Sequence, residues 1–143
     1  TKLQLNQKDR PTVELRFTVW QFVRLMVHIE EHANPSKPFA ALFAGWGDIW
    51  RPLDAELAEL AERDFEAYSE LMMDQEVVIE DATPEQAHTA QQAIDEIMTI
   101  MDRAIKADEE AGGKEGQNPE HLQNLKFERR ELRQLSRKLG RIA

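Results

Sequence analysis

Two short segments near the start of the chain, residues 2–5 and 13–17, alternate between apolar and polar side chains. A period of two is typical of a strand with one buried face. The polar residues between the segments end in Pro11, which favours a loop there. The pattern therefore predicts an N-terminal strand or hairpin segment over 1–17.

After Thr18 the spacing of the apolar residues changes from that of a strand to that of a helix. Gln21 follows Thr18 at the spacing of a capping box, which predicts a helix over about 19–33. Apolar side chains surround most of this helix, so we expect it to lie at the centre of its domain. It should end before Pro35, because the residue preceding a proline is disfavoured in the α region. We expect Val23, Met26 and Ile29 to be buried, and Gln21, Arg24 and His28 to be more exposed.

The segment 36–52 is rich in aromatic residues and contains two glycines. A short helix is predicted at its start, and Gly45 and Gly47 favour a break after it. Pro52 then suits the first turn of a further helix over about 52–74. The outer face of that helix is rich in Glu, so we expect this face to contact water.

The β-branched residues at the centre of 76–80 predict a second strand. A second capping box, over Thr83–Gln86, opens a predicted helix at 84–110. Gly112–Gly113 ends this helix, and residues 111–117 read as a linker before the last helix. Two strands, each followed by a capped helix, are therefore expected.

The last predicted helix runs from Asn118 to the end of the chain and has two opposed faces. We expect its leucines to pack on the domain or on a second chain, because isolated helices are marginally stable in water. We expect its basic face to point outward, because it lies opposite the leucines. The apolar face holds Leu125, Leu132, Leu135 and Leu139, and the basic face, here named the Arg ridge, holds Lys126, Arg130, Arg133, Arg137 and Arg141.

These elements predict one mainly α domain over 1–143. The fold class is a compact bundle of four main helices with a small accessory β-sheet, whose strands lie near 13–17 and 76–80, with 2–5 as a candidate third strand. The alternative is an all-α bundle in which 13–17 forms the first turns of the first helix. A chain of 143 residues is long enough to bury a core of its own.

Composition and charge exclude some kinds of functional site and disfavour some kinds of partner. The absence of Cys excludes disulfides, thiolate metal sites and a cysteine nucleophile, and it suits the cytoplasm. No apolar run approaches the roughly 20 residues of a membrane span, and no signal peptide pattern is visible. The formal net charge is −9. Residues 48–110 carry 4 basic and 19 acidic side chains, whereas 111–143 carry 8 basic and 4 acidic ones. The middle of the chain should therefore repel nucleic acid.

Two histidine patterns resemble metal sites. His28 and His32, with Glu31 between them, match an H-x-x-E-H arrangement, and His residues four apart can bind one metal from a single helix face. The pattern lacks a third metal ligand, so we expect these residues to form a polar helix face that contacts water. Glu85 and His88 form a single Glu-x-x-His pair, whereas di-iron bundles need two such pairs, and we expect His88 to face water.

Two further groups leave alternatives open. Asp64, His121 and Glu128 fall within apolar stripes. They form a buried polar cluster, a pH-sensitive switch or a ligand anchor, or else they lie at a stripe edge in contact with water or at a helix end. Trp46 and Trp50 stand about one helical turn apart. They belong either to the core or to an exposed binding site.

We expect a non-enzymatic protein–protein interaction or regulatory module whose partner is another protein or a second copy of the chain, with no cofactor and no native metal. The candidate partner-binding residues are the Arg ridge, Trp46 and Trp50. Three alternatives remain. The first is nucleic-acid binding through the Arg ridge, and the second is an acidic mimic of nucleic acid that inhibits another protein through the 48–110 surface. The third is a metal-binding helical protein that uses His28, Glu31 and His32.

Overall fold

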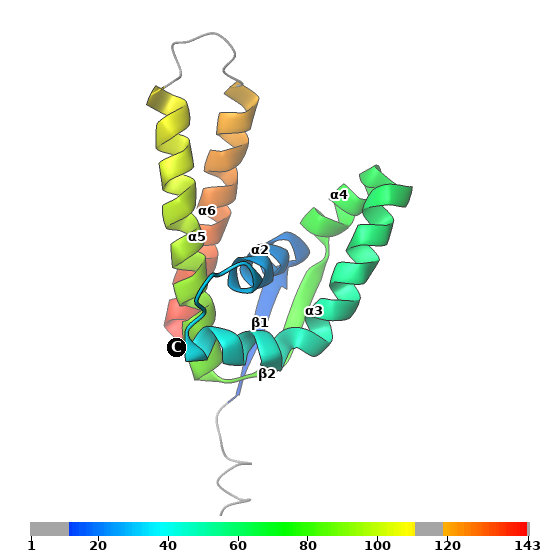
Figure 1. The fold of residues 1–143 in the computed structure, drawn as a ribbon, viewed down its shortest axis with the longest axis vertical. Coiled ribbons are helices and arrows are strands. Elements are labelled where there is room, and N and C mark those ends of the chain that lie inside the picture. Colours follow the sequence, from blue (N-terminus) through cyan, green and yellow to red (C-terminus); the bar gives the residue numbers. More distant parts are fainter. Residues whose placement is uncertain (1–11, 111–118, 143) are drawn as a thin grey trace, which may run out of the picture.

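The computed structural model of the protein describes residues 12–110 and 119–142 (Figure 1). The described part is mainly helical with a small antiparallel sheet of two strands, as predicted. The predicted strand over 2–5, the linker over 111–117 and Asn118 lie outside the described residues. In chain order the elements are β1 (Val13–Thr18), α2 (Val19–Glu30), α3 (Lys37–Arg63), α4 (Phe65–Asp74), β2 (Glu76–Ala82), α5 (Pro84–Glu110) and α6 (Pro119–Ile142).

The sheet pairs the two segments that the alternating pattern and the β-branched run predicted. β1 runs antiparallel to β2, and Leu15 lies opposite Ile79. Leu15, Phe17 and Ile79 are all buried, because alternate side chains of a strand point to the same face. The all-α alternative is therefore wrong. Residues 13–17 form a strand because their period of two buries one face against the helices.

Helix α2 is central, as its apolar circumference predicted. It lies between the α5–α6 pair and the α3–α4 pair (Figure 1). The capping box forms, because the Thr18 hydroxyl accepts from the Gln21 amide at 3.1 Å and the Gln21 side chain accepts from the Thr18 amide at 2.9 Å. Met26 and Ile29 are buried and Arg24 is exposed, as predicted.

Three details of α2 differ from the prediction. Gln21 is buried rather than exposed, because its side chain turns back to cap the helix. Val23 and His28 are both partly buried, so Val23 is more exposed than expected and His28 less. The helix ends at Glu30 instead of residue 33.

Helix α3 corrects the prediction of a break at Gly45 and Gly47. The helix continues from Lys37 to Arg63 and contains Pro52 in its interior. It bends along its length (Figure 1), which agrees with an internal proline. Glycine in a helix interior costs roughly 1 kcal/mol, and the burial of several large side chains outweighs that cost. The buried residues of α3 are Phe39, Leu42, Trp46, Gly47, Trp50 and Leu57.

The predicted helix over 52–74 is two helices in the structure. Asp64 separates α3 from α4, and its carboxylate accepts a hydrogen bond from the Ala67 amide at 3.1 Å. Asp64 is exposed and acts as the N-cap of α4. This carboxylate in an apolar stripe is thus a helix end in contact with water, one of the alternatives left open above.

Gly47→Ala is expected to raise the free energy of unfolding by about 0.5–1 kcal/mol, because alanine favours the helix and restricts the unfolded chain. A Cβ at this position would meet its nearest neighbour, the Arg51 guanidinium carbon, at 3.8 Å. Urea denaturation measures the change. Gly140→Ala is the matched control, since its Cβ would lie 2.7 Å from Gln91 Nε2 and should bring no such gain. A loss of stability in Gly47→Ala would contradict the expectation.

Helices α5 and α6 form an antiparallel pair that extends past the rest of the molecule (Figure 1). Leu132, Leu135 and Leu139 of α6 are buried in the main core, as the leucine face predicted. Ser136 adds a hydrogen bond of 2.6 Å from its hydroxyl to Asp95 of α5. None of the helices in the described ranges is both long enough and apolar enough to cross a membrane.

Candidate docking cleft

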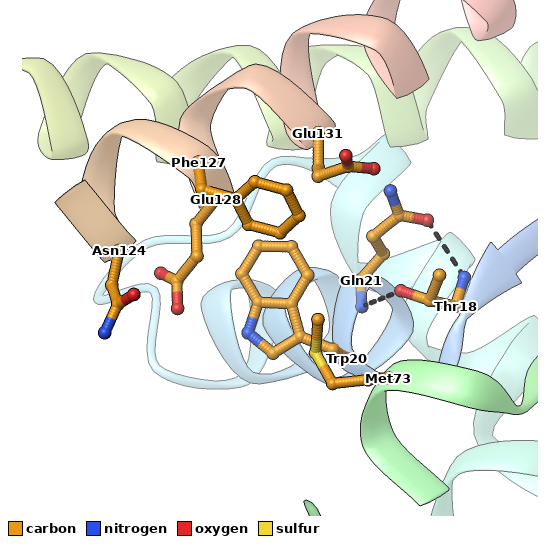
Figure 2. A pocket seen from close by; sticks show the side chains of 8 residues that line it. All are labelled: Thr18, Trp20, Gln21, Met73, Asn124, Phe127, Glu128 and Glu131. Atoms are coloured by element: carbon orange, nitrogen blue, oxygen red, sulfur yellow. Dashed lines mark hydrogen bonds between the residues drawn. The ribbon is translucent and has the colours of Figure 1, made fainter. Parts of the chain in front are cut away.

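A cleft of about 460 Å³ opens between α2, α4 and α6, beside the end of β1 (Figure 2). We name it the docking cleft. Its walls come from parts of the chain that are far apart in the sequence, so the fold alone brings them together. The lining residues are Thr18, Trp20, Gln21, Met73, Asn124, Phe127, Glu128 and Glu131.

Three large apolar side chains form the centre of the cleft. The side chains of Phe127 and Met73 approach the indole of Trp20 from α6 and from α4 (Figure 2). Phe127 is 45% exposed and Met73 is 53% exposed, whereas Trp20 is partly buried against the core. Large apolar side chains that gather at the surface mark contact sites for other molecules more often than scattered ones do.

An ion pair holds one wall of the cleft. Arg24 Nη2 donates to Glu128 Oε2 at 3.1 Å and thereby joins α2 to α6. The guanidinium carbon of Arg24 also lies 5.6 Å from the ring centroid of Trp20, which is within the range of a cation–π contact. Arg24 thus contacts both the indole of Trp20 and the carboxylate of Glu128. Glu128, one of the carboxylates within an apolar stripe, is thus partly buried and paired with Arg24.

The other polar groups of the lining differ in whether they have a hydrogen-bond partner. Thr18 and Gln21 satisfy each other through the capping box. Glu131 is partly buried, and within the described residues it forms no hydrogen bond or ion pair. The cleft therefore combines apolar walls with a single uncommitted carboxylate.

Exposed charges of opposite sign lie on α4 and α6 beside the cleft. On α4, Glu66 and Glu70 share a helix face with Met73 at helical spacing, and both are exposed. On α6, Arg130 lies three residues after Phe127, on the neighbouring side of the helix, and is also exposed. Glu66 and Glu70 thus share the α4 face of Met73, and Arg130 lies beside the α6 face of Phe127, whereas the charged residues that line the cleft itself, Glu128 and Glu131, are acidic.

All five residues of the Arg ridge are exposed. Lys126 Nζ lies 3.8 Å from Glu109 Oε1, and both side chains are about half exposed. Arg130, Arg137 and Arg141 form no ion pair with any residue that the structure describes. The ridge is therefore exposed, although Lys126 contacts Glu109 of α5 and the charge of Arg133 acts on Asp102 of α5.

The arginine that joins α5 to α6 is Arg129, which sequence reasoning missed. Its guanidinium donates to both carboxylate oxygens of Asp102, in one case at 3.1 Å. This hydrogen bonding lowers the pKa of Asp102, helped by the nearby charges of Arg129 and Arg133. Because folding lowers this pKa, the pair stabilises the fold above the unfolded pKa, and the contribution is lost as the pH falls through the lowered value.

Replacing Arg130, Arg133 and Arg137 with Ala is expected to shift the melting temperature by only a few degrees, because exposed charges contribute less than about 1 kcal/mol each. Thermal unfolding followed by circular dichroism measures the shift. Arg129→Ala is the matched control: it removes the Asp102 pair and should cost more than any single ridge residue. A drop of about ten degrees or more in the triple variant would show that the ridge is an internal clamp.

Trp46 and Trp50 do not belong to an exposed site. Each is 3% exposed, and together with Phe17 and Phe22 they form an aromatic cluster whose ring centroids lie 5.8–6.2 Å apart. The helix continues through both flanking glycines, so its apolar face turns both indoles into the core. We therefore remove both tryptophans from the candidate partner-binding residues.

The histidine pair contacts a carboxylate that sequence reasoning did not name. His28 Nε2 lies 2.8 Å and His32 Nε2 3.6 Å from Glu96 Oε1 of α5. Glu31 is exposed at the end of α2. Among the described residues, no group of three or more His, Asp or Glu is arranged to hold a metal ion. His88 is exposed, as predicted, and the side chain of His121 lies outside the described part.

No family model, curated protein or solved structure matches the chain in the three comparisons with known proteins.

Proposed function

We propose that the protein is a non-enzymatic protein–protein interaction module and that it binds its partner in the docking cleft. One observation carries this proposal: Phe127 and Met73, both about half exposed, approach Trp20 from two helices and line an open volume of about 460 Å³ with it. Aromatic residues and Met are enriched where proteins bind each other, and a pocket at the centre of an interface holds its strongest contacts.

The energetics support a docking role. Full burial of a Phe or Met side chain contributes about 1.5–3 kcal/mol relative to exposure. Phe127 and Met73 forgo much of this contribution in the isolated chain, because about half of each remains in water. A partner that covers both side chains recovers it. Arg24 contacts both Trp20 and Glu128 before any partner binds, and contacts formed in advance reduce the cost of ordering side chains on binding.

The polar groups of the cleft favour binding over catalysis. Glu128 is paired with Arg24, and Thr18 and Gln21 are bound to each other, so these groups are not available to orient a reacting substrate. Shifted pKa values cluster at catalytic sites. The pair with shifted pKa values in the described part, Asp102 and Arg129, joins α5 to α6 and does not line the cleft.

We assign the Arg ridge to the same protein interface rather than to nucleic acid. Its exposure would suit phosphate contacts, but the acidic face of α4 borders the same cleft and would repel a nucleic acid lying there. A protein partner can place opposite charges on both sides. We place this activity in the cytoplasm, where a chain without Cys needs no oxidising environment.

Site-specific photo-crosslinking in an extract of the native cells tests this function. A benzophenone side chain in place of Phe127 is expected to crosslink to a protein upon irradiation. The same probe in place of Ile100, an apolar residue of α5 that is 53% exposed and lies outside the cleft, should crosslink far less. Equal crosslinking at the two positions, or crosslinking of Phe127 to nucleic acid alone, would overturn the proposal.

A further inference from the structure

The exposed faces of α4 and α6 beside the docking cleft carry opposite charge. The charged residues that line the cleft itself are Glu128, which is paired with Arg24, and Glu131. Arg130 and Arg137 lie on α6, and Glu66 and Glu70 lie on α4. All four are exposed, and none of them forms an ion pair with another residue in the described ranges. Both sets of charges are therefore available to a partner.

We propose that the partner in the docking cleft is a second copy of this chain, related to the first by a two-fold axis that runs along the cleft. This inference rests on the proposed function and names its partner. A two-fold axis in that direction turns the second copy so that its Arg ridge lies over the acidic α4 face of the first. The reverse contact forms at the same time, because a two-fold interface makes every contact twice.

The apolar residues lie where such an interface needs them. Phe127 stands on the ridge side and Met73 on the acidic side, so both lie between the two charged faces. In the dimer the exposed parts of these side chains from the two copies meet at the centre. Interfaces with an apolar centre and a charged rim follow the same arrangement, and water excluded from the centre strengthens the charge pairs around it.

Other partners match only one side of the cleft. A uniformly acidic partner would pair with the Arg ridge but would be repelled by Glu66 and Glu70. A uniformly basic partner would pair with Glu66 and Glu70 but would be repelled by the Arg ridge. The net charge of −9 on each copy opposes association at long range, but ions screen it beyond about 8 Å at physiological salt. The local pairs act at shorter range.

Charge reversal on one side at a time tests the dimer. Arg130→Glu with Arg137→Glu sets an acidic α6 against an acidic α4, and Glu66→Lys with Glu70→Lys sets a basic face against a basic one. Each double variant alone should associate at least about tenfold more weakly than the wild type. An equimolar mixture of the two should dimerise again, because both contacts of the mixed dimer become complementary and its total charge equals that of the wild-type dimer.

The controls carry the same charge changes elsewhere. Arg103→Glu with Lys106→Glu on α5, and Glu80→Lys with Asp81→Lys on β2, alter exposed residues outside the cleft and should leave association unchanged. Melting curves establish that every variant is folded.

Sedimentation velocity of the purified chains, in a dilution series down to about 1 µM, gives the association state. A wild-type chain that stays monomeric throughout, reversed variants that associate like the wild type, or a mixture that remains monomeric would each overturn the inference. Crosslinking of the Phe127 probe to a different protein would overturn the second copy alone and leave the interaction module standing.

Discussion

Phe22→Ala is expected to lower the free energy of unfolding by about 3–5 kcal/mol, the largest single effect in this protein. Phe22 is 0% exposed, and its ring centroid lies 5.9–6.2 Å from those of Phe17, Trp46 and Trp50. Truncation would leave a cavity where α2, α3 and the sheet meet. The loss approaches the total stability of many domains, so part of the chain should be unfolded at room temperature.

Urea denaturation of Phe22→Ala, monitored by tryptophan fluorescence, measures this loss. Phe65→Ala is the matched control, since Phe65 is 70% exposed at the start of α4 and its removal should change stability by less than about 0.5 kcal/mol. If Phe22→Ala cost no more than Phe65→Ala, α2 would not be the centre of the core.

Leu132→Ala is expected to cost about 2–5 kcal/mol and to weaken partner binding as well. Leu132 is 0% exposed on the face of α6 that packs against α5. The same helix carries Phe127 and the Arg ridge on its other sides. Loss of this contact therefore loosens the α6 side of the interface, although the substituted residue is buried and touches no partner.

Hydrogen exchange separates this effect from general unfolding, because it reports the opening of each helix individually. Amides of α6 should exchange faster in Leu132→Ala, whereas those of α2 should change less. Leu125→Ala is the control, since Leu125 is only partly buried and should cost less. Unchanged protection of α6 would show that the helix is held by contacts other than its leucines.

Short-range signals account for the parts of the fold that were predicted. The Thr18–Gln21 and Thr83–Gln86 capping boxes both form with hydrogen bonds of 2.9–3.1 Å, because their geometry depends on four consecutive residues alone. α5 spans Pro84–Glu110 as predicted. The alternating residues of β1 find their partner in β2, since a half-buried strand needs another edge to pair with.

Two features of the helices were mispredicted, one through tertiary packing and one through a local cap. Gly45 and Gly47 disfavour a helix locally, but the aromatic residues around them are worth more when buried on one continuous face. Asp64 interrupts the helical pattern at 52–74 because its side chain caps α4. The course of α3 depends on what the segment packs against, which local propensity does not contain. The break at Asp64 is a local cap that the apolar stripe alone did not reveal.

The docking cleft lay beyond sequence reasoning for a geometric reason. Trp20, Met73 and Phe127 belong to three different helices, and only the crossing of α2, α4 and α6 brings them together. One signal was present, because Phe127 lies off the leucine face of its helix. An apolar residue off the buried stripe is a candidate contact residue, and the fold showed what stands opposite it.

The central claim is that the protein binds its partner through the docking cleft. The most direct test is the size of the fluorescently labelled protein in an extract of its native cells, measured by sedimentation for the wild type, Phe127→Asp and Ile100→Asp. We expect the wild type and Ile100→Asp to sediment as a complex and Phe127→Asp to sediment as a monomer. Identical sedimentation of all three would contradict the claim, because a charge at the centre of a docking site cannot leave binding unchanged.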